Sequence, residues 1–290
     1  MKPITVKSVL EVLEIAQTGT YTINSRTISL PRTPEALRRA VYYSPMETQI
    51  LANYYFNMEK PEKRPMTVSL SPLDSLRAAE VLHRKYPDAG KGILVLNFAN
   101  PHRPGGGIRE IPGTQEEQLC HNTTLLASIG SEGAAEFYTT NKMAKNDAQT
   151  DALLFSPHVM VLRNPDGTLR EDPFPIAILT VSAPIARRMT PEARDRLDAI
   201  LLGRIRGMLR AAMTEGYRHL VLGAWGCGSF GNDPDTVAAL FHQALTESFG
   251  PNGDYTAADF FEEVVFGIPD DSATRFRWHA FANYFQENTI

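Results

Sequence analysis

The sequence has few cysteines, no long apolar run and no excess of positive charge, and each lack excludes a class of protein. Its 290 residues include only two cysteines, Cys120 and Cys227, which are too few for a disulfide framework and do not form a C-x-x-C pair. No stretch reaches the roughly 20 apolar residues that span a bilayer, and the N-terminus lacks the apolar core of a signal peptide. We therefore expect no membrane partner and a location in the cytoplasm, or in the nucleus if the source is eukaryotic.

The charge balance and the histidines exclude two further classes. With 29 basic and 33 acidic residues, the net charge is −4, which argues against a surface that coats nucleic acid. The seven histidines show neither an H-E-x-x-H motif nor paired ligand spacing, so we expect no metal site. A composition of 43% hydrophobic and 21% charged residues is typical of a globular protein.

Apolar runs and helix signals alternate from about residue 66 onward, which favours an α/β layer sandwich with a mixed sheet. Before residue 66 the pattern predicts a short helix ending at Gly19, a hairpin over 21–30 and a helix start at Thr33. The strands predicted after it cover 66–71, 92–98, 159–162, 174–183, 219–224 and 263–268. The helices predicted between them cover 75–86, 114–129 and 190–215, a segment opened by Asp233-Pro234, and 272–285.

The first glycine-rich loop follows the predicted strand 92–98 and contains Gly105-Gly106-Gly107. Consecutive glycines let backbone N–H groups approach a ligand closely. Seven residues later, Gln115-Glu116-Glu117 open a helix and place two carboxyl groups beside this loop. A purely structural interpretation stays open, because Thr114-x-x-Glu117 is also a capping box and acidic residues suit a helix N-terminus.

The second glycine-rich loop runs from Gly223 to Pro234 and contains Gly226-Cys227-Gly228-Ser229-Phe230. Alternating glycines between a strand and a helix N-terminus form a concavity of amides that binds anions. The loop is not a Walker motif, since no G-K-[ST] follows, and a plain flexible connector is the alternative. The neighbouring amides favour deprotonation of the Cys227 thiol, but no histidine lies within three residues to make it a nucleophile.

Together these loops resemble one enzyme family. Gly-Gly-Gly, seven residues and Gln-Glu-Glu is similar to the signature of the poly(ADP-ribose) glycohydrolase family. The preceding Leu96-Asn97-Phe98-Ala99-Asn100 and Pro104 resemble its microbial-type branch, whose catalytic domain is a macrodomain. The resemblance extends from about Met66 to Ile268. It implies a macrodomain-like three-layer α/β/α sandwich over 66–290, with residues 1–65 as a mainly helical N-terminal extension packed on it.

The resemblance also implies an activity, namely hydrolysis of O-glycosidic ribose–ribose bonds in poly(ADP-ribose) from the chain end, without a cofactor. The partner would be the polymer or ADP-ribosylated proteins. A mono(ADP-ribosyl) hydrolase and a non-catalytic ADP-ribose reader remain alternatives, although an intact Gln-Glu-Glu argues against the reader.

The same resemblance assigns roles to residues of the two loops. Glu117 would act as the acid and base, and Glu116 would anchor a ribose hydroxyl or tune the proton affinity of Glu117. Phe230 would pack against the terminal ribose, and Asp74 would lie near the adenine. The remaining substrate-binding residues would be Asn100, Gly105, Gly106, Gly107, Gln115, Gly226, Cys227, Gly228 and Ser229.

Overall fold

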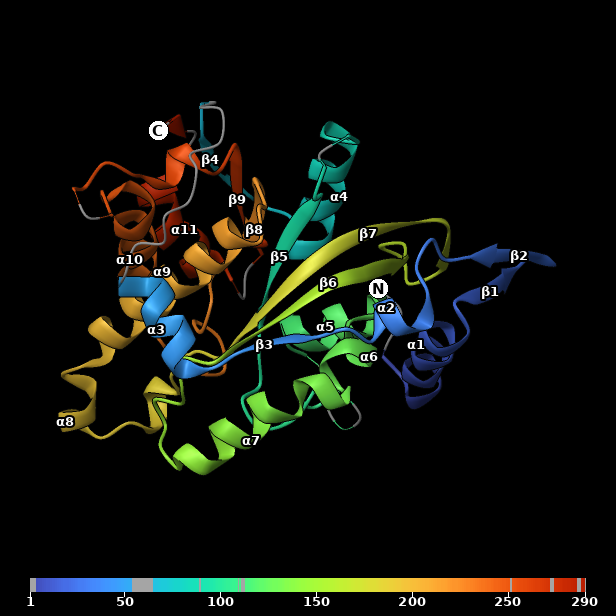
Figure 1. Cartoon of the computed structure of the whole chain (residues 1–290), viewed down its shortest axis with the longest axis horizontal. Coiled ribbons are helices and arrows are strands. Elements are labelled where there is room, and N and C mark those ends of the chain that lie inside the picture. Colours follow the sequence, from blue (N-terminus) through green and yellow to red (C-terminus); the bar gives the residue numbers. More distant parts are fainter. Residues whose placement is uncertain are drawn as a thin grey trace.

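A mixed sheet of eight strands lies at the centre of the molecule (Figure 1). The computed structural model describes residues 4–53, 65–88, 90–108, 110, 113–250, 252–271, 274–285 and 288–289. The strand order is β10-β4-β9-β8-β5-β7-β6-β3, parallel from β4 to β7 and antiparallel at the other three pairings. The strands are β3 (Val41–Tyr43), β4 (Thr67–Ser71), β5 (Ile93–Phe98), β6 (Leu153–Arg163), β7 (Leu169–Val181), β8 (His219–Leu222), β9 (Glu263–Gly267) and β10 (Asn288–Thr289).

Helices cover both faces of this sheet. One face carries α3 (Pro45–Asn53), α9 (Leu197–Thr214), α10 (Pro234–Thr246) and α11 (Arg275–Phe285). The other carries α1 (Val6–Thr18), α4 (Ser75–Lys85), α5 (Gln115–Asn122), α6 (Leu125–Ile129) and α7 (Ala135–Ala144). Two short helices complete the set: α2 (Pro34–Leu37), whose Leu37 packs with side chains of α1 and β6, and α8 (Pro191–Arg194), which buries no side chain. The predicted three-layer α/β/α sandwich with a mixed sheet is therefore confirmed.

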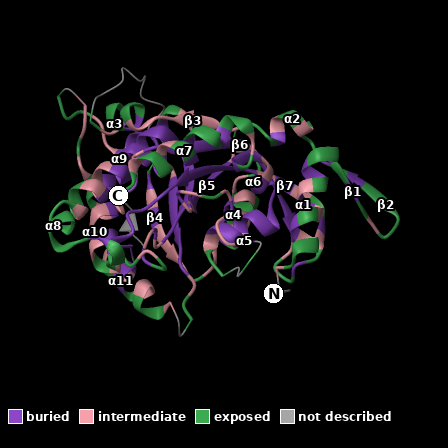
Figure 2. Ribbon diagram, turned by 90° about the horizontal axis from the view of Figure 1, so that it is seen from below, coloured by how far each residue is buried: buried purple, intermediate pink, exposed green. Residues whose placement is uncertain are grey.

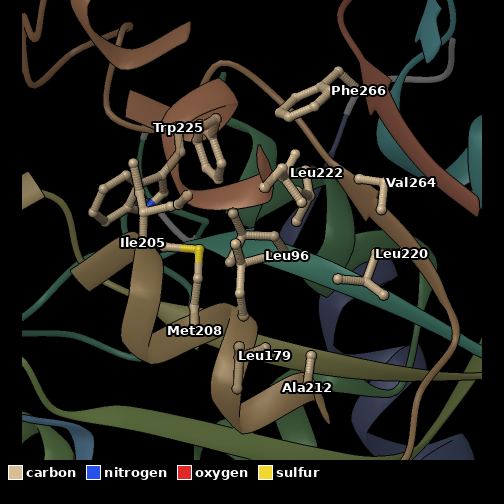
Figure 3. Packing of buried hydrophobic residues seen from close by; sticks show 14 of the residues in the cluster. Leu96, Leu179, Ile205, Met208, Ala212, Leu220, Leu222, Trp225, Val264 and Phe266 are labelled. Atoms are coloured by element: carbon tan, nitrogen blue, oxygen red, sulfur yellow. The ribbon is translucent and has the colours of Figure 1, made fainter. Parts of the chain in front are cut away.

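The central strand β5 shows why the sheet needs both helical layers. Successive side chains of a strand point to opposite faces. Leu94 and Leu96 accordingly enter the core under α9 and α10, where Leu96 packs with Met208 (Figure 3). Ile93 and Val95 enter the core under α4 and α5. All four side chains are buried, so the near-continuous apolar run of the sequence corresponds to a strand covered on both faces (Figure 2).

The N-terminal residues extend this architecture. The Thr5 side chain caps α1, and Gly19 ends it in the left-handed region at φ 72°. The predicted hairpin follows as β1 (Thr20–Ile23) and β2 (Arg26–Ser29), which project beyond α1 (Figure 1). Strand β3 pairs with β6 at the edge of the main sheet, and Leu51 of α3 lies in the core with α9. The domain boundary after residue 65 stays a prediction.

Two predicted helices are each divided in two. The one expected over 114–129 is interrupted at Thr123, which is extended because it forms a β-bridge with Val161. The one expected from Thr190 ends as α8 and begins again as α9 at Leu197, since α8 buries no side chain that would hold it on the sheet. One continuous helix was therefore a wrong prediction at both places. The last predicted helix is observed as α11, while residues 272 and 273 lie outside the described part.

Two glycines of α9 provide a test of its contact with α3. A Cβ added to Gly207 would lie 2.5 Å from Cγ2 of the buried Thr48, whereas one added to Gly203 meets no atom within 4 Å. We expect Gly207→Ala to lower the free energy of unfolding by about 1–3 kcal/mol through overpacking, although alanine is the better helix former.

The matched control is Gly203→Ala, which should raise the free energy of unfolding by up to about 1 kcal/mol. Urea unfolding of both variants measures the difference. Equal stabilisation by the two substitutions would contradict the close approach of α3 to α9.

Candidate active site

A cavity of about 510 Å³ opens where several parallel strands end. Its walls include Phe98 at the end of β5, Ala224 after β8 and Gly267 at the end of β9. Both glycine-rich loops reach it, the first through Gly106 and the second through Gly226. Ligands of open α/β sheets bind at this edge, because loops and helix N-termini meet there.

Helix α5 is fixed to the sheet by its first residue. The Gln115 side-chain oxygen accepts a hydrogen bond from Phe98 N at 2.9 Å, and its Nε2 donates to Leu96 O at 2.7 Å. The same Nε2 donates to Ser75 Oγ of α4 at 3.1 Å. Gln115 thus joins α5 to β5 and α4, in addition to lining the cavity.

Glu116 is 1% exposed and lies behind the first loop. Its Oε2 accepts from Asn100 N at 2.8 Å, and its Oε1 accepts a long hydrogen bond of 3.4 Å from Asn97 Nδ2. Burial raises the pKa of Glu116 to about 8, and the nearby charge of Glu117 adds to the rise, while the hydrogen bonds from Asn100 and Asn97 oppose it. The Glu116 carboxyl is therefore predominantly neutral at pH 7.

Glu117 is 4% exposed and is held by three backbone amides. Gly107 N donates to Oε1 at 2.8 Å, and Gly113 N and Thr114 N donate to Oε2 at 2.5 and 2.7 Å. The last contact belongs to the capping box with Thr114. The structural and the catalytic interpretations of this motif are thus compatible, because the same carboxyl group caps α5 and lines the cavity.

The backbone conformation and the surroundings of position 106 explain why a glycine lies opposite the two acids. Its φ is +56°, a region that side chains disfavour. A Cβ at this position would lie 3.1 Å from Glu116 Oε2 and 3.1 Å from Glu117 Oε1. The two carboxyl groups therefore converge on the space that the missing side chain leaves.

The second loop depends on Gly226 in the same way. Its φ is +76°, and a Cβ would lie 2.6 Å from Ala183 Cβ and 2.5 Å from Asn232 Nδ2. Asn232 Nδ2 in turn donates to Pro184 O at 2.9 Å and to Gly226 O at 3.0 Å, which closes the loop. Gly228 has nothing within 4 Å of an added Cβ. Gly228 is part of the cavity wall.

The loop leads directly into helix α10. Asp233 is its N-cap, with Oδ2 accepting from Thr236 N at 2.8 Å, and Pro234 is the first helical residue. The N-terminus of this 13-residue helix thus follows the loop, as the Asp-Pro pair predicted. A helix N-terminus that follows a glycine-rich loop favours an anionic group.

Most residues predicted for the site share the cavity wall, and three do not. The lining includes Asn100, Gly106, Gln115, Glu116, Glu117, Gly226, Gly228, Ser229 and Phe230. Gly105 faces the core at Leu126. Gly107 contributes its amide to Glu117. Cys227 is buried beneath the loop.

The structure corrects the expected chemistry of Cys227. Neighbouring amides were expected to favour its thiolate. Burial instead raises the pKa of the Cys227 thiol to about 12, and the positive charge of Arg277 opposes this only in part. The thiol therefore stays protonated at neutral pH.

Sequence reasoning gave no role to several residues that line the cavity or support its wall. Asn97 was part of the quoted motif but received no role, although its amide donates to Glu116 and to Thr180 Oγ1. Thr274 and Arg277 line the cavity from the end of the chain and belong to no motif. Asp74, which the resemblance placed near the adenine, does line the cavity, and it also caps α4 by accepting from Leu76 N and Arg77 N.

Comparison with known proteins identifies the family. The model described as "Microbial-type PARG, catalytic domain", where PARG is poly(ADP-ribose) glycohydrolase, matches residues 10–164. The chain belongs to the microbial-type poly(ADP-ribose) glycohydrolase family. A search of curated proteins gives no match.

Solved structures of this family resemble the chain over most of its length. The poly(ADP-ribose) glycohydrolase of Thermomonospora curvata is 33% identical, with a TM-score of 0.81 over 96% of this chain and 98% of that one. Its structure bound to the inhibitor ADP-HPD gives 32% identity and a TM-score of 0.80 over the same shares. The Deinococcus radiodurans enzyme in complex with ADP-ribose gives 30% identity and a TM-score of 0.74, covering 89% of this chain and 98% of that one.

Two other features were searched for in the described ranges. Among those residues, no three His, Cys, Asp or Glu side chains are grouped so as to hold a metal ion. No helix in the same ranges combines the length and apolar character needed to cross a membrane.

Two glycine variants test the geometry of the second loop. We expect Gly226→Ala to lower the free energy of unfolding by about 2 kcal/mol or more, because it combines a positive φ with overpacking. Gly228→Val should instead leave stability within about 0.5 kcal/mol and weaken ADP-ribose binding. Urea unfolding and titration calorimetry check both expectations. Unchanged ADP-ribose affinity in Gly228→Val would contradict a ligand at this amide surface.

The raised pKa of Glu116 predicts a pH-dependent stability. An unfolded chain releases this proton near pH 4.5, but the folded protein keeps it to about pH 8, so stability from this group is lost as the pH rises between these values. Glu116→Gln removes this loss. Its free energy of unfolding relative to the wild type should therefore increase by roughly 1–4 kcal/mol from pH 5 to pH 8. A difference that does not change with pH, measured by urea unfolding, would contradict a neutral Glu116.

Proposed function

We propose that this protein hydrolyses the O-glycosidic ribose–ribose bonds of poly(ADP-ribose) and releases ADP-ribose from the end of the polymer, with Glu117 as acid and base. The observation that carries the proposal is the convergence of two buried carboxyl groups on Gly106, in a cavity that also contains the second glycine loop. The related Thermomonospora curvata enzyme binds ADP-HPD and the Deinococcus radiodurans enzyme binds ADP-ribose, which supports the same substrate class here.

The bond cleavage needs a proton for the leaving oxygen and a water for the anomeric carbon. In our proposal Glu117 donates the proton, and its carboxylate then takes a proton from the attacking water. The amides of Gly107, Gly113 and Thr114 already surround this carboxyl group, so the negative charge that forms on it meets hydrogen-bond donors that are in place.

Glu116 has the complementary role in this proposal. Because its carboxyl is neutral near pH 7, the acid pair carries one proton there, and in this proposal that proton reaches Glu117 before it passes to the leaving oxygen. A neutral carboxyl group also donates a hydrogen bond, which suits an anchor for a ribose hydroxyl. Asn100 N and Asn97 Nδ2 hold its oxygens toward the first loop.

The second loop would hold the diphosphate. Gly228 and Ser229 line the cavity a few residues before α10, whose N-terminus would add positive potential. Phe230 would pack against the terminal ribose, and Asp74 would lie near the adenine. Holding the diphosphate would fix the scissile bond relative to Glu117.

We further propose that residues 1–65 form an extension of a glycohydrolase domain over 66–290, and that the protein acts in the cytoplasm. Its substrates would be the polymer or ADP-ribosylated proteins, without a nucleic-acid or membrane partner. The net charge of −4 supports the exclusion of nucleic acid.

The test is a comparison of wild type and Glu117→Gln on poly(ADP-ribose). We expect the variant to lose at least about 1,000-fold in kcat, because both proton transfers depend on this side chain. ADP-ribose affinity by calorimetry should stay within about threefold, because a glutamine keeps the volume and an acceptor oxygen. Substantial turnover by the variant would remove Glu117 from the acid role.

Two controls complete this experiment. Glu136→Gln, on an exposed position of α7, should behave as the wild type. Protein carrying single ADP-ribose units, assayed in parallel, separates the alternatives. Release from this substrate alone would favour a mono(ADP-ribosyl) hydrolase, and binding without release from either substrate would favour a reader.

A further inference from the structure

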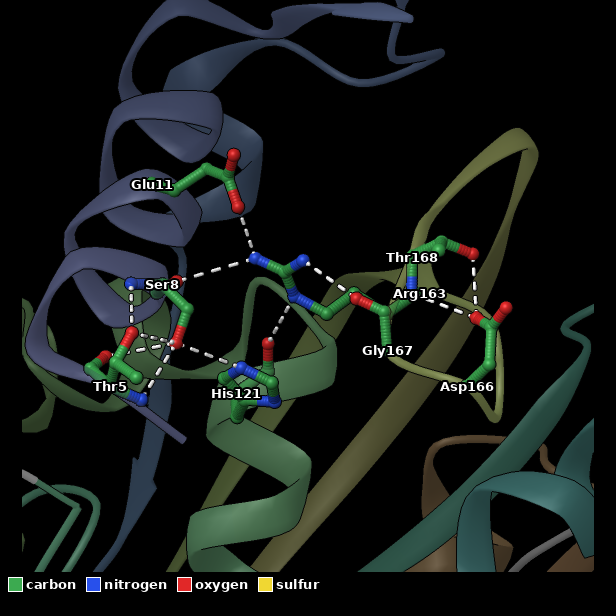
Figure 4. A network of polar contacts seen from close by, with 8 residues as sticks. All are labelled: Thr5, Ser8, Glu11, His121, Arg163, Asp166, Gly167 and Thr168. Carbon is green, nitrogen blue, oxygen red and sulfur yellow. Dashed lines mark hydrogen bonds and ion pairs between the residues drawn. The ribbon is translucent and has the colours of Figure 1, made fainter. Parts of the chain in front are cut away.

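Arg163 ends strand β6 and joins three parts of the chain through one buried guanidinium group (Figure 4). Its side chain is 6% exposed. Nη2 forms an ion pair with Glu11 and donates to Ser8 O at 3.4 Å, both on α1. Nε donates to His121 O at 3.2 Å, and Nη1 donates to Gly167 O at 3.1 Å. These acceptors belong to α1, to α5 and to the turn between β6 and β7.

The contact with His121 concerns the helix that carries the acid pair. Helix α5 has eight residues, so it extends only about 12 Å from Gln115 to Asn122. A helix this short moves as one unit, and a displacement of one end therefore moves the other. Gln115 fixes the first end to β5. Arg163 binds a carbonyl near the other end, where a positive charge also complements the helix dipole.

Helix α1 contacts the same end of α5 directly. His121 Nε2 lies 3.0 Å from Ser8 Oγ, and this hydroxyl belongs to the capping box that starts α1. The first turns of α1 are therefore bound to α5 both through Arg163 and through His121. Figure 4 shows this chain of contacts from Thr5 to Gly167.

Glu11 supplies the negative charge in this network. The other acceptors of Arg163 are backbone carbonyls of Ser8, His121 and Gly167. A buried guanidinium without its carboxylate partner is costly, so loss of Glu11 should disturb the whole junction. The Glu11 side chain is itself 44% exposed and does not line the cavity.

We propose that Arg163, charge-balanced by Glu11, is a positioning residue that holds α5 and thereby the carboxyl groups of Glu116 and Glu117 in their reactive arrangement. The proposal rests on the proposed function. Arg163 also touches the cavity wall, next to Asn164 and Pro165, so an effect of its substitution alone could arise from a ligand contact. Glu11 separates the two explanations, because it pairs with Arg163 but does not line the cavity.

The experiment compares Arg163→Met, Glu11→Ala and their double variant, with Glu14→Ala as the matched control on an exposed position of the same helix. We expect Arg163→Met and Glu11→Ala to lower kcat on poly(ADP-ribose) by about 10-fold or more, because small displacements of catalytic groups are costly. ADP-ribose affinity should change by less than about threefold, and the double variant should be no worse than Arg163→Met. Glu11→Gln, which keeps the hydrogen bond, should recover part of the lost kcat.

Amide hydrogen exchange gives a readout that needs no activity. Glu11→Ala should speed exchange across residues 118–122 and leave α10 unchanged, since α5 belongs to the Arg163 junction and α10 does not. Exchange in the Glu11→Ala variant also tests the proposal if Arg163→Met does not fold. Unchanged amide exchange in α5 of the Glu11→Ala variant would overturn the proposal. So would a loss of ADP-ribose affinity in Arg163→Met if Glu11→Ala changed neither affinity nor kcat. Absence of turnover in the wild type would instead contradict the proposed function.

Discussion

Glu116 and Glu117 are buried side by side at the wall of the cavity, where two negative charges would repel each other with little water to screen them. The structure resolves this repulsion by giving the two groups different surroundings. Glu116 is more deeply buried and keeps its proton near neutral pH, whereas Glu117 accepts hydrogen bonds from three amide N–H groups. The first loop needs a glycine at position 106, because a side chain there would occupy the space onto which both carboxyl groups converge.

The second loop depends on the chain segment at the end of strand β7. Donors from two parts of the chain occupy the carbonyls of this segment. Trp225 Nε1 and Asn232 Nδ2 of the loop itself donate to Val181 O and Pro184 O, and the buried Arg204 of α9 donates to Ser182 O. The segment therefore forms a rigid wall against which Gly226 lies. Binding by backbone amides needs such a wall, because amides have no flexible side chain that can adjust to a ligand. In the proposed function, a protein of net charge −4 would in this way hold a diphosphate with little side-chain charge.

Elements with strong local signals were predictable from the sequence. Helices α4 and α10 begin at Asp74 and Asp233, whose side chains bind the first free amides, and β5 is a buried apolar run. Strand β3 was missed because three half-buried residues give no alternation, and it forms only by pairing with β6. Helix α7 was missed because much of it is polar or exposed. The break at Thr123 had no local signal, since its cause is a bridge to Val161 in another strand.

The sequence by itself determined the two loops, the helix starts that follow them and the acid pair, because glycines, caps and carboxyl groups act through neighbours within a few positions of the chain. Only the tertiary structure decided which acid keeps its proton, that Cys227 is a buried thiol with a raised pKa, and that Arg163 connects α1 to α5. The reason is physical: a pKa and a buried ion pair depend on the solvent and charges around a group. Those surroundings come from segments far away in the sequence, as Glu11 and Arg163 show.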